Sequence, residues 1–180
     1  MKVYNSHEIK NIALLGNDGS GKTTLTESLL FESGQIKRRG RITMKNTVSD
    51  YFPVEQDYGY SVFSTVFHTE WNGKKLNIID CPGSDDFVGA AMTALNVTDT
   101  AILLLNGQYG VEVGTQNHFR YTEKLGKPVI FLVNQLDNEK CDYDNVLEQL
   151  QSIYGSKVVP VQYPLETGPN FNAVIDVLLM

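Results

Sequence analysis

The sequence predicts an α/β fold built on a mostly parallel, doubly wound sheet, with one antiparallel edge strand and helices on both faces. Short apolar runs alternate along the chain with stretches of helical periodicity, which is the pattern of strand–helix–strand units. The pair Asn72-Gly73 separates two strand-like segments and is a type I′ hairpin signal, so two neighbouring strands are expected to be antiparallel. A layered α/β domain follows from these two observations.

Composition and charge are those of an ordinary globular protein. The chain has 180 residues, of which 42% are hydrophobic and 20% charged, so one domain with a large core is expected. Lysine and arginine total 15 against 21 aspartates and glutamates, which gives a net charge of −6. This balance weakens the case for a basic nucleic-acid binder without excluding it, and we expect no direct DNA binding.

No segment of the sequence indicates secretion or membrane insertion. The first ten residues have no apolar core, and no apolar stretch approaches the roughly 20 residues that span a bilayer. The two cysteines, Cys81 and Cys141, lack CxxC or cysteine–histidine ligand spacing, so neither a zinc site nor a disulfide framework is indicated. We therefore expect a cytoplasmic protein with reduced thiols and no membrane partner.

The first half of the chain is predicted to begin with a buried strand over 11–16, followed by a helix over 23–32 with three leucines on one side. Residues 35–59 show no steady period and contain glycine and proline breaks. Such a long loop is unusual unless it is functional or mobile. Residues 61–71 alternate as a strand does, and 75–80 are expected to form the returning strand of the hairpin.

The second half of the chain repeats the alternation of helices and strands. Helices are predicted over 87–96, 113–125 and 143–154. Strands are predicted over 101–105, 129–133 and, as a last short strand, 158–161. The run 101–105 is uniformly apolar, as a strand covered on both faces should be.

The turn between the first strand and the first helix fits the phosphate-binding pattern G-x-x-x-x-G-K-[ST]. The predicted phosphate-binding residues are Gly16, Asn17, Asp18, Gly19, Ser20, Gly21, Lys22, Thr23 and Thr24. Glycines let backbone N–H groups converge on phosphate oxygens, and the helix N-terminus adds partial positive charge. Lys22 is expected to reach the β- and γ-phosphates, and the Thr23 hydroxyl to bind Mg²⁺. A flexible loop with a chance lysine is the alternative, which the flanking strand and helix disfavour.

A second pattern, D-x-x-G, follows the strand that completes the hairpin. It comprises Asp80, Cys81, Pro82 and Gly83. The Asp80 carboxylate is expected to hold Mg²⁺ through water, and Gly83 can bring its N–H to the γ-phosphate with no side chain in the way. Alone this pattern usually marks a turn, but its place on a strand after the phosphate-binding loop favours a γ-phosphate sensor.

A third pattern, N-x-x-D, ends the apolar strand over 129–133. Its predicted guanine-binding residues are Asn134, Gln135 and Asp137. A carboxylate at this place can accept two hydrogen bonds from the N1–H and N2–H₂ edge of guanine, whereas adenine offers no such donor pair. The pattern therefore favours GTP over ATP, although without the other two patterns a simple turn would be the better interpretation.

The three patterns, in order and at strand ends, resemble the N-terminal GTP-binding domain of the elongation factor G family of ribosomal translocases. The resemblance covers roughly residues 9–178 and includes the segments 11–16, 21–27, 76–83 and 160–165. Tetracycline-resistance ribosomal protection proteins share much of it. The resemblance implies a P-loop GTPase fold, GTP or GDP with Mg²⁺ as cofactors, and the ribosome as partner.

The departures from this family concern catalytic more than binding groups. The family has a histidine after D-x-P-G that positions the attacking water, whereas this chain has Ser84. In the mobile loop a gapless count places Ser61 where the family's metal-binding threonine stands, and Tyr58 where its arginine stands. The resemblance therefore implies Thr23, Ser61 and, through water, Asp80 as the metal ligands.

Two further departures concern nucleotide binding. Gly19 stands where the family's phosphate-binding loop has an aspartate, and Gln135 replaces a lysine that packs along the base and braces that loop. Three hypotheses follow. The chain is a GTP-binding domain whose hydrolysis is slow or absent, or an active GTPase helped by the ribosome or a rearranged loop, or a nucleotide-free scaffold.

The family resemblance also bears on domain organisation. A further guanine-contacting Ser-Ala loop, expected in such GTPases, is not found in this sequence. In the family that loop lies beyond an inserted subdomain. We expect residues 1–180 to be a GTP-binding domain truncated at the start of this insertion, at about 160–180, and lacking the downstream domains.

Overall fold

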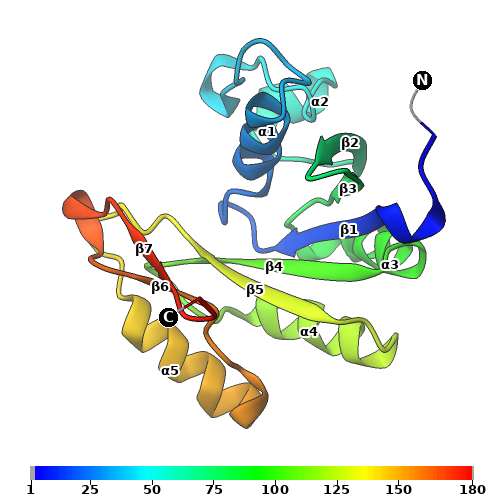
Figure 1. The fold of residues 1–180 in the computed structure, drawn as a ribbon. Helices are drawn as coiled ribbons and strands as arrows, with labels where there is room; N and C mark the ends of the chain where they lie inside the picture. Colours follow the sequence, from blue (N-terminus) through cyan, green and yellow to red (C-terminus); the bar gives the residue numbers. More distant parts are fainter. Residues whose placement is uncertain (1–2, 180) are drawn as a thin grey trace.

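The computed structural model describes residues 3–179 and shows a five-stranded sheet in the order β2-β3-β1-β4-β5 (Figure 1). The strands are β1 (Ile9–Gly16), β2 (Thr65–Trp71), β3 (Lys74–Asp80), β4 (Thr100–Asn106) and β5 (Val129–Asn134). β2 and β3 are antiparallel, and all other neighbours are parallel. The predicted mostly parallel sheet with an antiparallel edge strand is therefore confirmed.

Helices cover both faces of this sheet, as expected. The helices are α1 (Lys22–Glu32), α2 (Pro53–Tyr58), α3 (Val88–Val97), α4 (Val113–Lys124) and α5 (Tyr143–Tyr154). Figure 1 shows α1 and α4 on opposite sides of the sheet. The alternation of β1 explains this division: Leu14 belongs to the core cluster that includes leucines of α1, whereas Ala13 and Leu15 belong to the cluster with α3 and α4.

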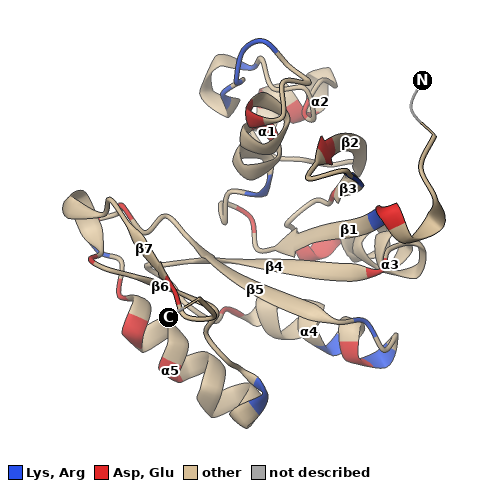
Figure 2. Ribbon diagram, viewed as in Figure 1, with Lys and Arg blue, Asp and Glu red and all other residues tan. Residues whose placement is uncertain are grey.

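The strand register brings the predicted site residues to one edge of the sheet. Leu14 pairs with Asp80, and Asn106 pairs with Asn134. Parallel strands point their carboxyl ends the same way, so the turns after β1, β3, β4 and β5 meet at that edge. β4 and β5 carry no charged residue (Figure 2); β4 lies between two strands and is mostly buried, whereas β5 is the edge strand of the sheet.

The expectation of an irregular segment over 35–59 is only partly right. It contains a 3-10 turn, Ile42–Met44, and the short helix α2. Pro53 begins α2, where its fixed φ and missing N–H cost nothing, and Glu55 accepts the Phe52 N–H at 3.3 Å. Six residues are too few to show a helical period in the sequence. The strand predicted over 61–71 begins only at Thr65, so Ser61 belongs to the loop.

The strand predicted over 158–161 is wrong. These residues follow the 3-10 turn Gly155–Lys157 without strand pairing, and Pro160 has no N–H for a sheet ladder. The next residues form β6 (Gln162–Pro164), which pairs with β7 (Val174–Asp176) in a separate antiparallel hairpin. Tyr163 of β6 packs edge-on against Tyr143 of α5, with ring centroids 5.0 Å apart, and this contact holds the hairpin on α5.

Three further 3-10 turns complete the description: Ser6–Glu8, Asp85–Phe87 and Gly168–Asn170. Within residues 3–179 no helix is long and apolar enough to cross a membrane.

Candidate functional site

The phosphate-binding loop connects β1 to α1 and is shaped by glycines with positive φ. Gly21 has φ 98°, and a Cβ at this position would collide with the side-chain amide of Asn134. Glycine is therefore required where the loop touches the turn after β5. Lys22 begins α1 and is buried, and its Nζ donates to the carbonyls of Gly16 and Asn17, both at 2.9 Å. Burial lowers the pKa of Lys22, although the nearby Asp80 carboxylate opposes this shift.

The sensor loop lies directly against the phosphate-binding loop. A Cβ on Gly83 would lie 2.6 Å from both the Asp18 backbone N and Lys22 Nζ, so only glycine fits. Asp80 ends β3 and is buried beside these groups, with its pKa raised to about 7 by desolvation. Cys81 and Pro82 are buried next to it, and burial raises the pKa of the Cys81 thiol to about 12, so the thiol stays protonated.

The predicted metal ligands lie together in the structure. Thr23 Oγ1 donates to Asp80 Oδ2 at 3.2 Å and lies 3.2 Å from Ser61 Oγ. Ser61 in turn donates to Asp50 Oδ1 at 2.7 Å. The three predicted residues thus come from α1, the loop before β2 and the end of β3, and the structure adds Asp50, which sequence reasoning missed.

Asp50 and Asp80 form a pair of buried carboxylates. Desolvation is the largest cause of the raised pKa of each, and the charge of Asp50 raises the pKa of Asp80 further. Asp50 Oδ2 and Asp80 Oδ1 are buried and have no hydrogen-bond partner among the described residues. Two such oxygens beside two hydroxyls make an all-oxygen donor set, which suits Mg²⁺ when phosphate and water complete its shell. The residues present therefore fit the expected cation.

Ser84 does not lie among the residues lining the phosphate-loop cavity. Its hydroxyl accepts the Asp86 N–H at 3.3 Å and caps the 3-10 turn Asp85–Phe87. His118, on α4, is the buried histidine of the described chain. Burial, followed by the charge of Lys22, lowers the pKa of His118 to about 4, so its imidazole is neutral at pH 7.

The end of β5 and the turn after it, where guanine-binding residues are predicted, are hydrogen-bonded to the phosphate-binding loop by two adjacent side chains. Asn134 Nδ2 donates to the Ser20 carbonyl, and Gln135 Nε2 donates to the Gly19 carbonyl, both at 2.9 Å. Gln135 thus keeps a brace to this loop although it lacks the charge of a lysine. Asp137 is exposed in the same turn.

A cavity of about 180 Å³ marks the junction of these loops. The predicted site residues that line it are Asp18, Gly19, Gly21, Lys22, Thr23, Thr24, Ser61, Gly83 and Gln135, joined by Asp50. The other predicted site residues lie outside its lining: Gly16, Asn17, Ser20, Asp80, Cys81, Pro82, Ser84, Asn134 and Asp137. A larger cavity of about 880 Å³ between β5 and α5 has a mainly apolar lining and contains none of the predicted site residues.

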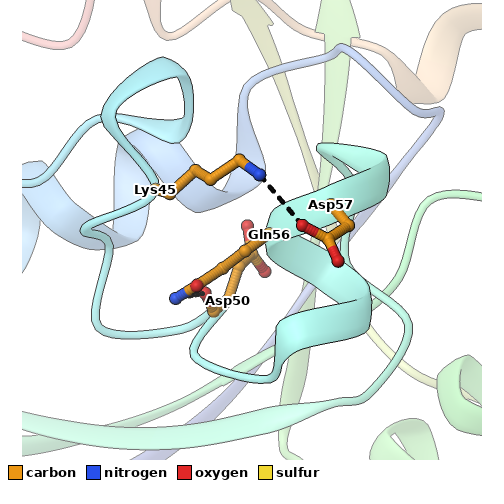
Figure 3. Close-up of polar contacts among 4 residues, drawn as sticks. All are labelled: Lys45, Asp50, Gln56 and Asp57. Carbon is orange, nitrogen blue, oxygen red and sulfur yellow. Dashed lines mark hydrogen bonds and ion pairs between the residues drawn. The ribbon is translucent and has the colours of Figure 1, made fainter.

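The loop over 35–63 is folded against α1 and closed upon itself. Glu27 of α1 is buried and accepts the N–H groups of Gly40 and Val48, while Glu55 of α2 accepts those of Val62 and Phe63. Figure 3 shows the outer contacts of the loop, where Lys45 pairs with Asp57 at 3.0 Å and Gln56 donates to the Asp50 carbonyl at 3.3 Å. The loop therefore presents Asp50 and Ser61 to Thr23.

A comparison with protein families matches residues 7–174 to the family described as the elongation factor Tu GTP binding domain. The chain belongs to this family. The match spans the whole sheet and every loop of the site. The resemblance to GTP-binding domains of translation factors, expected from the three patterns, is therefore confirmed.

Comparisons with individual proteins agree with this family. An elongation factor G-like protein of Thermotoga maritima is 35% identical over 170 residues, which cover 94% of this chain and 24% of that protein. Elongation factor G of Salinibacter ruber is 36% identical over 169 residues, with the same coverage. A crystal structure from Thermus thermophilus matches 94% of this chain and 26% of its own, with a TM-score of 0.89 and 38% identity. This translation-factor GTP-binding domain thus spans about a quarter of the length of its curated relatives.

Proposed function

We propose that this domain binds GTP and GDP with Mg²⁺ as the nucleotide module of an elongation factor G-like factor, and that it hydrolyses GTP slowly or not at all. The proposal of slow or absent hydrolysis rests on the position of Ser84 in the structure. Its hydroxyl caps a 3-10 turn, and its family counterpart is a water-positioning histidine. The proposal therefore separates binding, for which the groups are present, from hydrolysis, for which one is missing.

Phosphate binding is assigned to residues 16–24. The backbone N–H groups of the loop and the N-terminus of α1 favour anionic oxygen, and the Lys22 ammonium is held among them. When phosphate oxygens are present, they would compete with the Gly16 and Asn17 carbonyls for this ammonium. We assign guanine recognition to Asn134, Gln135 and Asp137, with the Asp137 carboxylate accepting from the guanine edge.

Metal binding is assigned to Thr23 and Ser61, with Asp80 and Asp50 acting through water. Bound Mg²⁺ would neutralise phosphate charge and orient the β- and γ-phosphates. The loop residues Asp50 and Ser61 would thereby couple the loop over 35–63 to the bound nucleotide, since they reach Thr23 only when that loop is folded in. A nucleotide-dependent switch then operates through binding alone.

Slow hydrolysis follows from the groups that surround position 84. A serine hydroxyl is neither a base nor a cation near neutral pH, and the Ser84 hydroxyl is already engaged by Asp86. Asp85 and Asp86 are exposed acids, and a carboxylate beside the γ-phosphate would oppose the charge that the transition state develops. His118 is neutral and buried in α4, so it supplies no positive charge either.

The deciding experiment compares GTP turnover of the unsubstituted chain and of Ser84→His, with and without ribosomes. We expect a rise of about 10²-fold or more in Ser84→His, since general acid–base groups contribute about 10²–10⁴-fold. Rapid phosphate release by the unsubstituted chain would show that the site is already competent. No change in Ser84→His would mean that Tyr58 or Gly19 also limits hydrolysis.

A nucleotide-free scaffold is the second candidate, because the Lys22 ammonium is already satisfied by two carbonyls and Gly83 lies against it. Calorimetric titration with GTP, GDP and ATP separates the candidates. Micromolar binding of guanine nucleotides supports the first candidate, no detectable binding at millimolar nucleotide supports the scaffold, and preference for ATP overturns the guanine assignment.

The proposal also covers the whole protein. We propose that an inserted subdomain starts at about 160–180 and that further domains follow it, since the curated relatives are about four times as long. The ribosome as partner and a cytoplasmic location are also part of the proposal.

A further inference from the structure

A chain of three hydrogen bonds runs from the turn after β4 to the phosphate-binding loop. The Gln108 N–H donates to Asn106 Oδ1 at 2.8 Å, and Asn106 Nδ2 donates to Gln135 Oε1 at 2.9 Å. Gln135 Nε2 then donates to the Gly19 carbonyl at 2.9 Å. Every donor points the same way along the chain, so the orientation of both side-chain amides is fixed by their partners.

This chain fixes a backbone unit of the nucleotide site. The peptide between Gly19 and Ser20 is held at both ends, because its carbonyl accepts from Gln135 and its N–H donates to the Asn17 carbonyl at 3.2 Å. Gln135 adopts φ 59°, a left-handed conformation that a residue other than glycine adopts only when its surroundings hold it. Gly19 and Gln135 both line the small cavity.

In this series of hydrogen bonds, Gln108 contributes only its backbone N–H, so Asn106 is the side chain farthest from the cavity. It ends β4, is 7% exposed and lies outside the cavity lining. Because Gln108 occupies its oxygen, its nitrogen must face Gln135, and Gln135 must then present its own nitrogen to Gly19. A buried, satisfied amide at position 106 thus dictates which way the glutamine amide faces.

We propose that Asn106 is a positioning residue for nucleotide binding: it orients Gln135, which pre-orders the phosphate-binding loop, so that an Asn–Gln amide pair performs without charge the bracing that the family assigns to a lysine. This inference rests on the proposed function, since it concerns the same nucleotide site. The Asn106 side chain lies outside the cavity lining, and its nitrogen reaches the site through its hydrogen bond to Gln135.

The direction of the three hydrogen bonds predicts which substitutions should weaken GDP binding and which pair should restore it. In Gln135→Lys the ammonium has donors only, and it faces the Asn106 nitrogen. Turning the Asn106 amide relieves that conflict but sets its nitrogen against the Gln108 N–H. In Asn106→Asp the carboxylate accepts from Gln108 but needs a donor from Gln135, whose amide must then turn its oxygen toward the Gly19 carbonyl. Each single change breaks one link of the hydrogen-bond chain and leaves a group without a partner, whereas the Asn106→Asp/Gln135→Lys pair restores every link.

The experiment measures GDP affinity by competition with a fluorescent GDP analogue in four chains: unsubstituted, the two single variants and the double variant. Each single change should weaken GDP binding by about three- to tenfold, the range for loss of one or two net hydrogen bonds. The double variant should return to within about twofold of the unsubstituted chain. Gln151→Lys, which adds the same charge on the exposed face of α5, is the matched control and should leave GDP binding unchanged.

Urea unfolding of the same chains without nucleotide distinguishes positioning from a general structural role. The inference holds if GDP affinity falls in the single variants by more than their loss of stability explains, and is rescued in the double variant. Unchanged affinity in both single variants overturns it, as does an additive loss in the double variant. If the unsubstituted chain fails to bind GDP, the proposed function fails and this inference fails with it. If the unsubstituted chain binds GDP but the substitutions leave its affinity unchanged, only this inference is overturned.

Discussion

The Ser61 hydroxyl donates a 2.7 Å hydrogen bond to Asp50 Oδ1 and lies 3.2 Å from Thr23 Oγ1, so these contacts join the loop over 35–63 to the N-terminal end of α1. Only 5% of the surface of Asp50 is exposed to solvent, and its second carboxylate oxygen has no hydrogen-bond partner among the described residues. A buried oxygen of this kind is costly unless a cation or a donor satisfies it. If Mg²⁺ binds at Thr23 as proposed, this pair would link loop conformation to metal binding.

Asp50→Asn should weaken Mg²⁺-dependent GDP binding by about 10- to 100-fold, the usual cost of losing an outer-shell carboxylate. The physical reason is the loss of one of two negative charges beside Thr23. The measurement is the Mg²⁺ concentration that gives half-maximal GDP affinity. Asp57→Asn is the matched control, because Asp57 is an exposed acid of α2 that pairs only with Lys45 at the loop surface (Figure 3). Equal effects of the two variants would contradict the assignment of Asp50.

The raised pKa of Asp80 predicts how the stability of the domain depends on pH. Burial raises the pKa of this carboxyl to about 7 from an ordinary 3.8, so between these values the folded state binds more protons than the unfolded state. Stability that this group contributes is therefore present at low pH and is lost as pH rises from about 4 to 7. Urea unfolding in a chelating buffer at pH 5 and pH 7 measures it. Asp80→Asn should flatten this part of the profile, and an unchanged slope would contradict the raised pKa.

Local patterns were sufficient to predict most of the fold, including the turn between β1 and α1 that carries the phosphate-binding pattern. Residues 16–23 run without a break from the end of β1 through a short turn into the start of α1, so spacing along the chain reports their positions in space. The same holds for Asp80 and Gly83 after β3. Helix α2 was missed because six residues carry too little periodicity, although Pro53 before an acid marks a helix start.

The roles of Asp50 and Asn106 could not be predicted, because they depend on contacts between distant segments. Asp50 lies in a stretch without periodicity, and only the folding of that stretch onto α1 by Glu27 brings it to Thr23. Asn106 ends β4, and the sequence of that strand does not reveal its partner Gln135, which follows β5 directly. The strand predicted over 158–161 failed for a related reason, since an apolar run does not reveal whether a neighbouring edge is available to pair with it.

Gly114, in the first turn of α4, lies against the side chain of Asn17. A Cβ at this position would collide with Asn17 Oδ1, in the phosphate-binding loop. Gly114→Ala should displace that side chain, so overpacking offsets the roughly 0.5–1 kcal/mol that alanine gains in a helix and the free energy of unfolding should not rise. Gly89, in the first turn of α3, has no atom within 4 Å of a built Cβ, so Gly89→Ala should instead stabilise by about 0.5–1 kcal/mol. Urea unfolding of both variants tests the contrast, and stabilisation by both would contradict the contact with Asn17.

The last prediction concerns the buried carboxylate that holds the loop over 35–63. Glu27 accepts the Gly40 N–H at 2.7 Å through one oxygen and the Val48 N–H through the other. In Glu27→Gln one of these oxygens becomes an NH₂ group and faces an N–H donor. Loss of a hydrogen bond to a charged group costs about 1.5–3 kcal/mol, so the loop should open about ten- to a hundredfold more often.

The rate of trypsin cleavage measures this opening, because trypsin cuts after lysine and arginine and the loop contains Lys37, Arg38, Arg39, Arg41 and Lys45. Cleavage at these residues should accelerate by about tenfold or more in Glu27→Gln while the rest of the chain resists, since local opening exposes only this segment. Glu32→Gln, at the exposed end of α1, is the matched control and should be cut at the rate of the unsubstituted chain. Equal cleavage of Glu27→Gln and its control would show that Glu27 does not hold the loop.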